Sequence, residues 1–378
     1  MTVRPGDIVP NPPTHGPANR GVPGATKGPI AHVHQGVPLP DADRAGVNPT
    51  SLDAATGELL AGSLRELFAS LTDGRRLGNE LDQLGWDEVL AEDPAWATTL
   101  LFTEHGRSLA SSRALDDILL AELSPVLPAA TGPRALLYPD PADADVPASS
   151  GGALRGLLLG DLTDVAEVVV PFSTPDGVGL LVVSAAALQD QLSPAAAFDP
   201  AIGWQRVADA AVPAGPSPVP AAVEWERAVA AGHRAVAAEL IGICEAALAL
   251  AVEHTSARFQ YGRAIASFQA VRHRLSEAHV AIASARSMLD AAWTAAGRPD
   301  GPWAARLAKV RAGRAQAEVM RHGVQVLGAM GLTRESDMHR FVTRAAALDA
   351  LLGGHRALTG ALGADLLAGA DLLPVVEI

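Results

Sequence analysis

Two short runs in the last third of the chain hold residue types suited to an anionic ligand. The first, RFQYGRAIASFQAVRHRL, covers residues 258–275, and the second, QVLGAMGLTRE, covers residues 325–335. An arginine such as Arg258 offers a fork of donors on a permanent cation, which is what a diphosphate requires. A glycine such as Gly328 allows close contact where a side chain would collide. The two runs could therefore serve a phosphate-bearing ligand.

Both features also have simpler interpretations, and the residues alone leave these open. Arg258 at the end of a helix could merely complement the helix dipole. Tyr261 and Gly262 could form an ordinary carboxyl-terminal helix stop.

The elements that would position these runs are helices. From about Ala222 onward, apolar residues at helical spacing predict four long helices with short connections, which is typical of an antiparallel four-helix bundle spanning residues 222–378. In the second helix the apolar seam steps by three and four from Phe268 to Ala292, and Ser267 is expected to cap its start. The third and fourth helices are predicted over 303–327 and 337–367.

The chain before the bundle is predicted to have three parts, which makes the fold class α+β and multidomain. Residues 1–50 are rich in Pro and Gly and indicate a flexible arm, and residues 51–125 show helical spacing typical of a small α-domain. Residues 126–215 hold short β-rich runs, with a Pro175-Asp176-Gly177 turn that predicts a hairpin. The expected strands are 135–138, 154–160, 165–172 and 178–185, with a further one over 204–212, and 213–220 is expected to be a linker.

Composition excludes several classes of function. The net charge of −13 over 378 residues argues against nucleic acid as a partner. Glu239 and Glu245 interrupt the most apolar stretch, so no membrane span is expected, and a lone Cys244 fits a small buried side chain in a cytoplasmic protein. No metal site is expected, since His15, His32 and His34 stand without further ligands at suitable spacing. Neither a Gly-x-Ser-x-Gly elbow nor a Walker loop occurs.

The two runs, 67 residues apart from Arg258 to Gln325, resemble the carboxyl-terminal motifs of the acyl-CoA dehydrogenase family. The resemblance covers residues 222–352 well, and residues 51–215 more weakly through the layout and the run LRGLLLGDLTDVAEVVVPF. It implies an acyl-CoA dehydrogenase-like fold and FAD-dependent α,β-dehydrogenation of an acyl-CoA thioester. It also implies FAD binding by Arg258, Gln260, Phe268, Gln269, Gln325 and Gly328.

The resemblance breaks at the base that removes the α-proton. The family holds this carboxylate at one of two positions, which fall here on Gly353 and Gly232, so no catalytic base is assigned. The weak substitutes are Asp349 and Glu226, and further neighbours are Glu224, His233 and His355. A solvated surface or helix-end role is the favoured interpretation for all five.

The family's flavin-ring loop and its Trp-bearing strand are also missing, since the chain offers ALLYPDPADADVPASSGG, with Ser149 and Ser150 as the only hydroxyls of that loop, and LRGLLLGDL. The phosphate-binding half of the flavin site is kept, and in the family it serves the flavin of a neighbouring subunit. The resemblance therefore implies a dimer or heterotetramer with a homologous acyl-CoA dehydrogenase subunit. Acyl-CoA, with a fatty or steroid-derived chain, and an electron-transfer flavoprotein are the other implied partners. Two alternatives remain: a complete homomeric dehydrogenase with a relocated base, and a non-enzymatic CoA-thioester binder or scaffold.

Overall fold

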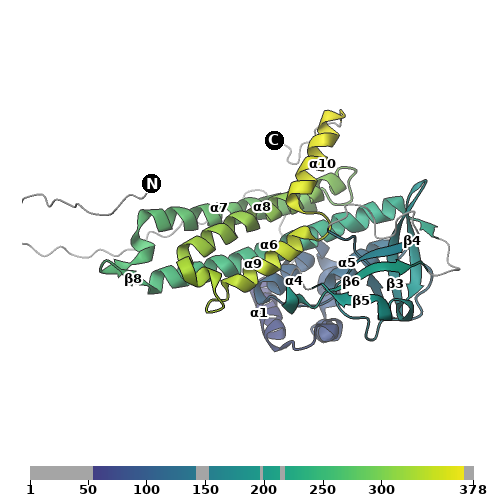
Figure 1. Ribbon diagram of the computed structural model, residues 1–378, viewed down its shortest axis with the longest axis horizontal. Helices are drawn as coiled ribbons and strands as arrows, with labels where there is room; N and C mark the ends of the chain where they lie inside the picture. Colours follow the sequence, from purple (N-terminus) through teal and green to yellow (C-terminus); the bar gives the residue numbers. More distant parts are fainter. Residues whose placement is uncertain (1–53, 142–152, 196–198, 213–217, 370–378) are drawn as a thin grey trace, which may run out of the picture. The chain divides into compact units, whose positions relative to one another are not determined.

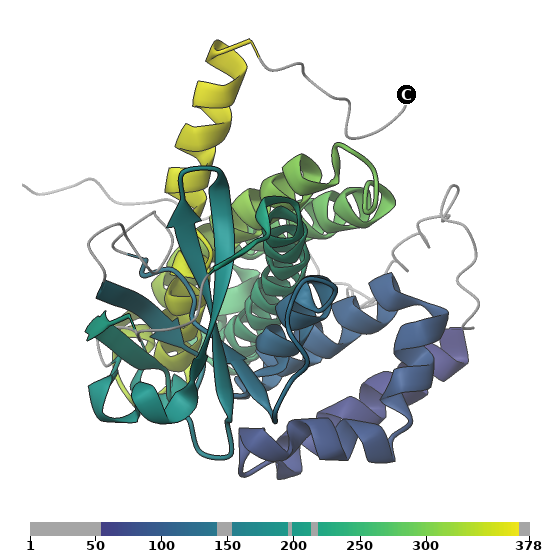
Figure 2. The same ribbon diagram turned by 90° about the vertical axis from the view of Figure 1, so that its right-hand side faces the viewer.

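The computed structural model describes residues 54–141, 153–195, 199–212 and 218–369. The predicted amino-terminal arm with its histidines, and residues 142–152 with Ser149 and Ser150, lie outside these residues. Figures 1 and 2 show the described elements from two directions.

Residues 54–123 form five α-helices. They are α1 (Ala54–Ser70), α2 (Leu77–Gln83), α3 (Trp86–Glu92), α4 (Pro94–Ser108) and α5 (Ala114–Leu123). The start of α4 follows from local sequence, because the Asp93 side chain accepts the Trp96 amide and Pro94 stands in the first turn. Its end is marked by Leu109 at φ 53°, a left-handed residue that reverses the chain before Ser112.

Short strands form two sheets between the helical parts. The strands are β1 (Arg134–Leu136), β2 (Ala153–Leu158), β3 (Glu167–Thr174), β4 (Gly177–Ser184), β5 (Leu192–Pro194), β6 (Gln205–Ala211) and β7 (Val219–Pro220). The sheet orders are β1-β3-β4-β7 and β2-β6-β5. The predicted hairpin is confirmed: β3 and β4 pair antiparallel from Glu167–Ser184 to Thr174–Gly177. The end of the predicted linker pairs with β4 as β7, because Leu180 lies opposite Val219.

The carboxyl-terminal helices are α6 (Ala222–Ala257), α7 (Gln269–Thr294), α8 (Gly301–Leu327), α9 (Met338–Ala350) and α10 (His355–Leu367). The prediction of one fourth helix over 337–367 is therefore wrong. Leu352 at φ 56° and Gly353 at φ 96° break it, because left-handed residues cannot continue a right-handed helix. After this break α10 leaves the direction of α9 (Figures 1 and 2).

The start of α7 also differs from the prediction. Phe268 is the residue that precedes the first helical turn, and no side chain caps it. Ser267 lies in a short 3₁₀ turn, η5 (Ile265–Ser267), and its hydroxyl donates to the Ala264 carbonyl at 2.7 Å. This hydrogen bond directs the Ser267 hydroxyl back along the chain, so it is not available to the backbone amides at the start of α7.

Helix α6 is the central element of the described fold. It packs against α4, α5, α7, α8 and α9, and Cys244 on it is 1% exposed, as expected for a small apolar side chain. Glycines allow the closest approach: a Cβ on Gly242 would lie 2.0 Å from the Thr103 carbonyl oxygen, and one on Gly106 would lie 2.2 Å from that of Glu239. By length and composition α6 could also cross a membrane, but 67% of that apolar window is buried inside the protein, as in a core helix.

Candidate functional site

The run that begins at Arg258 forms an exposed hairpin between α6 and α7. Strands β8 (Phe259–Gln260) and β9 (Arg263–Ala264) pair across a two-residue turn, in which Tyr261 and Gly262 both have positive φ, 53° and 75°. Positive φ at both central residues is the signature of a type I′ turn. The interpretation of Tyr261-Gly262 as a helix stop is therefore wrong, because the chain leaves the helix earlier, at Arg258.

Arg258 lies free at the surface of this hairpin. Its backbone is extended at the end of α6 (φ −84°, ψ 125°), and among the described residues its guanidinium makes no hydrogen bond or ion pair. Gln260 is likewise exposed. The neighbouring Arg263 is occupied, since its guanidinium stacks 4.1 Å from the centre of the Phe268 ring. Gln269 begins α7 and is exposed.

The second run lies at the same end of the bundle, because α8 runs back toward the hairpin (Figure 1). Gln325 is exposed in the last turn of α8, and Gly328 ends this helix with φ 64° and ψ −137°. Only glycine adopts this conformation readily, and a Cβ there would meet no atom within 4 Å. Gly328 is therefore required by backbone conformation and leaves open space beside it.

The two expected base positions lie close together although they are far apart in sequence. A Cβ on Gly232 of α6 would lie 2.7 Å from the Leu352 side chain and 2.9 Å from that of Leu119 on α5. Leu352 directly precedes Gly353. A Cβ on Gly353 would lie 2.9 Å from the side chain of Leu358 on α10, so leucine side chains occupy the space beside each glycine.

The sequence and the fold were compared with those of known proteins. Residues 226–365 match the acyl-CoA dehydrogenase carboxyl-terminal domain model. Acyl-CoA dehydrogenase IpdE2 of Mycobacterium tuberculosis is 39% identical over 110 residues, 29% of this chain and 33% of that protein. The chain thus matches about a third of the length of this curated relative, and 38% of its counterpart in Mycolicibacterium smegmatis.

Solved structures share the fold over most of the chain. The ChsE4-ChsE5 complex of Mycobacterium tuberculosis contains a chain that superposes with a TM-score of 0.65 at 19% identity, over 86% of this chain and 100% of that one. A glutaryl-CoA dehydrogenase of Mycobacterium smegmatis in complex with FADH2 has a TM-score of 0.61 at 13% identity, over 85% and 97%. Residues 226–365 are thus similar to the carboxyl-terminal domain of acyl-CoA dehydrogenases. The fold of the chain is the α+β, acyl-CoA dehydrogenase-like fold expected from the sequence.

The loop at Leu352 and Gly353, where the resemblance led us to expect a base position, is fixed from two sides. His233 of α6 donates its Nε2 proton to the Leu352 carbonyl at 3.0 Å, and the buried Lys309 of α8 donates to the Gly353 carbonyl at 3.2 Å and to that of Asp349 at 2.7 Å. Burial lowers the pKa of His233 to about 3 and that of Lys309 to about 8. His233 is therefore a neutral donor at neutral pH, which contradicts its expected surface position.

The other substitute bases differ in their surroundings. Asp349 accepts from the His355 ring at 2.7 Å and lies 3.8 Å from the Lys309 ammonium group, so it is an engaged, largely buried carboxylate and not a solvated one. Glu226 is exposed and lines a hollow of about 260 Å³ between α6 and α8, together with His233 and Arg306. Glu224 is half-buried and does not line this hollow.

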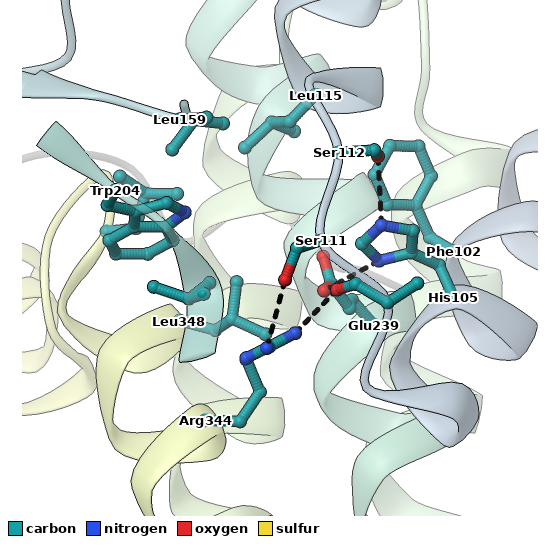
Figure 3. A pocket seen from close by; sticks show the side chains of 13 residues that line it. Phe102, His105, Ser111, Ser112, Leu115, Leu159, Trp204, Glu239, Arg344 and Leu348 are labelled. Atoms are coloured by element: carbon teal, nitrogen blue, oxygen red, sulfur yellow. Dashed lines mark hydrogen bonds and ion pairs between the residues drawn. The ribbon is translucent and has the colours of Figure 1, made fainter. Parts of the chain in front are cut away.

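A buried polar cluster at the junction of α4, α5, α6 and α9 was not predicted from the sequence. His105 lies between Glu239, whose Oε1 is 2.9 Å from Nδ1, and Ser112, whose Oγ is 2.9 Å from Nε2 (Figure 3). Beside them Arg344 pairs with Asp199 at 2.9 Å. These groups border a cavity of about 20 Å³.

The cavity has mainly apolar walls, provided by Phe102, Leu115, Leu159, Ile202, Trp204 and Leu348. The one signal in the sequence was Glu239, an acid inside an otherwise apolar helical stretch. A buried acid requires a partner, and its identity depends on the packing of α4 against α6.

Proposed function

We propose that this chain takes part in FAD-dependent α,β-dehydrogenation of an acyl-CoA thioester as the subunit that completes the flavin site of a homologous partner. The observation that carries this proposal is a contrast. The guanidinium of Arg258 is exposed and unpaired within the described residues. The two expected base positions fall on Gly232, which packs against Leu119 and Leu352, and on Gly353, which packs against Leu358.

The residues present fit the diphosphate of FAD better than its flavin ring. Arg258, Gln260 and Gln325 offer exposed donors at one end of the bundle, and Gly328 leaves space next to its backbone, which suits a diphosphate. The junction cavity of about 20 Å³ holds roughly one water molecule, whereas sites for drug-sized ligands measure about 300 Å³ or more. A flavin ring does not fit this cavity as the described side chains define it.

Bound FAD supplies the hydride acceptor in this chemistry. In our proposal Arg258 neutralises and orients the diphosphate of a flavin seated on the partner, and Gln260 and Gln325 add neutral donors. The proton acceptor must come from the partner, because glycine has no titratable side chain. This division assigns binding to this chain and proton transfer to its neighbour.

The likeness to a chain of the two-component ChsE4-ChsE5 complex supports the heteromeric assembly. The family resemblance is the basis for three further parts of the proposal: a heterotetramer in the cytoplasm, an electron-transfer flavoprotein as electron acceptor, and a bulky acyl-CoA, such as one with a steroid-derived chain, as substrate.

The test is expression of the chain alone and together with a homologous acyl-CoA dehydrogenase chain from the same genome. We expect the lone protein to be colourless and the co-purified complex to be yellow and active. Arg258→Ala should yield a complex that has lost most of its flavin, and Arg227→Ala, on an exposed part of α6, serves as the matched control. A lone chain that binds flavin and turns over acyl-CoA would contradict the proposal. Full activity of the Arg258→Ala complex would favour a non-enzymatic scaffold.

One observation favours a second candidate, a homomeric dehydrogenase with a relocated base. Glu226 lines the hollow of about 260 Å³ that also contains His233, so a carboxylate borders a space larger than the junction cavity. Under this alternative the lone protein is active and Glu226→Gln abolishes turnover. Asp349→Asn is the parallel test at the break between α9 and α10.

A further inference from the structure

We infer that Ser112, His105 and Glu239 form a hydrolytic triad for a short acyl ester or thioester, separate from the exposed flavin-binding end of the bundle. The Ser112 Oγ lies 2.9 Å from His105 Nε2, and Glu239 Oε1 lies 2.9 Å from His105 Nδ1. A hydroxyl in reach of a base, with the base held by a third group, is the arrangement that activates a serine nucleophile.

Hydrogen bonding fixes the direction of each proton in this cluster. Glu239 as a carboxylate can only accept, so His105 donates from Nδ1 and its Nε2 is left as an acceptor. Ser112 Oγ accepts the Ala114 amide at 3.3 Å, which leaves the hydroxyl proton to point at His105 Nε2. This is the tautomer in which imidazole can take a proton from a serine hydroxyl.

The fold holds the three residues from different elements. Gly106 and Gly242 bring α4 and α6 together so closely that His105 faces Glu239. Leu109 in the left-handed region turns the chain at the end of α4, which returns Ser112 to His105 from seven positions away. His105 is 6% and Glu239 4% exposed, whereas Ser112 is only partly buried. The base and the carboxylate are therefore enclosed, and Ser112 is the least buried of the three residues.

Arg344 of α9 supports the loop that carries Ser112. Arg344 lines the same cavity and holds the loop in front of it, with donors to the Ala110 carbonyl at 2.5 Å and the Ser111 hydroxyl at 3.2 Å (Figure 3). Its Nε pairs with Asp199 at 2.9 Å, so the guanidinium is held in place beside this loop. The cavity of about 20 Å³ has room for one water molecule, so an acyl group must reach Ser112 from outside the cavity, and short acyl groups are the expected ones.

The reaction balances without a cofactor. Ser112 Oγ attacks the carbonyl carbon as its proton moves to His105 Nε2, and the bond from carbon to the leaving oxygen or sulfur breaks as His105 returns that proton to the leaving group. Water then attacks the acyl-serine, His105 takes its proton, and Ser112 Oγ leaves with that proton as the free hydroxyl while the carboxylic acid is released.

The test uses the full chain, a fluorophosphonate probe that labels activated serines, and p-nitrophenyl acetate as substrate. We expect the probe to label Ser112, as mapped by peptide mass spectrometry. We expect Ser112→Ala to abolish labelling, and His105→Gln and Glu239→Gln to slow it by at least about 100-fold. Ser124→Ala, a surface serine at the end of α5, should change neither the labelling nor the hydrolysis.

Peptide mapping on the unaltered protein keeps the test decisive if the variants fold poorly. An unlabelled Ser112 at probe concentrations that label a known serine hydrolase would overturn the inference and leave the cluster a structural network. Labelling of Ser112 that His105→Gln does not slow would overturn it too. Neither readout depends on flavin or on a partner subunit, so the result is independent of the proposed dehydrogenation role.

Discussion

Gly232 and Leu352 are in direct contact across the bundle, since a Cβ on Gly232 would lie 2.7 Å from the Leu352 Cδ1 atom. Two hydrogen bonds strengthen this contact. His233, which follows Gly232, donates to the Leu352 carbonyl, and Lys309 of α8 donates to the carbonyl of Gly353, which follows Leu352. The region around these two residues is thus a packed and hydrogen-bonded part of the core.

Removing the free guanidinium should weaken flavin binding without unfolding the protein. Arg258→Ala in the co-purified complex should bind FAD about 10- to 100-fold more weakly, because a hydrogen bond to a charged group contributes about 1.5–3 kcal/mol. Arg258→Lys should retain part of the affinity, because lysine keeps the positive charge but lacks the forked donors of the guanidinium. Flavin titration by absorbance measures the change, and an unchanged dissociation constant for Arg258→Ala would exclude this residue from the site.

A methyl group at the contact between α4 and α6 should destabilise the whole fold. Gly242→Ala places a Cβ 2.0 Å from the Thr103 carbonyl oxygen, and backbone atoms must move to relieve the overlap. We expect the free energy of unfolding to fall by about 1–3 kcal/mol. Gly360→Ala in α10, where a Cβ meets no atom within 4 Å, should instead stabilise by about 0.5–1 kcal/mol. Urea unfolding followed by circular dichroism compares the two, and equal effects would contradict the close approach of the helices.

His233 should make the protein less stable in mild acid. Its pKa is about 3 when folded and 6.5 as the ordinary value, so between these limits the unfolded chain binds more protons and the free energy of unfolding falls as pH falls. From pH 7 to pH 5 this loss amounts to about 2 kcal/mol. His233→Gln keeps a donor for the Leu352 carbonyl and removes the titrating group. The free energy of unfolding of this variant should therefore fall by about 2 kcal/mol less than that of the wild type between pH 7 and pH 5. Urea unfolding at both pH values tests this, and parallel losses in the two proteins would show that His233 is accessible to protons.

Asp116 of α5 should have the opposite effect over the same range. Its burial raises the carboxyl pKa to about 7, so the folded chain binds more protons between pH 3.8 and 7 and the free energy of unfolding falls as pH rises. Asp116→Asn can still accept the Leu136 amide, which lies 3.4 Å from Oδ2. We expect the free energy of unfolding of the variant, relative to that of the wild type, to rise by about 2 kcal/mol between pH 5 and pH 7. A difference that is independent of pH would contradict the raised pKa.

The sequence by itself determined the elements whose signals are local. Periodic apolar residues located α6, α7 and α8, and the turn Pro175-Asp176-Gly177 identified the β3–β4 hairpin. The two motif runs indicated the resemblance to acyl-CoA dehydrogenases, because each run is a continuous stretch of the sequence. The break at Leu352 and Gly353 was missed, since Leu352 takes a left-handed conformation that its residue type does not favour.

Only the tertiary structure decided which distant residues meet. It brought Gly232 against Leu352, buried Lys309 under the Gly353 carbonyl, and left Arg258 exposed. It also joined His105 to Glu239, which are 134 positions apart. The physical reason is that periodicity and turn chemistry act over a few residues, whereas the environment of a buried polar group depends on how closely whole helices pack.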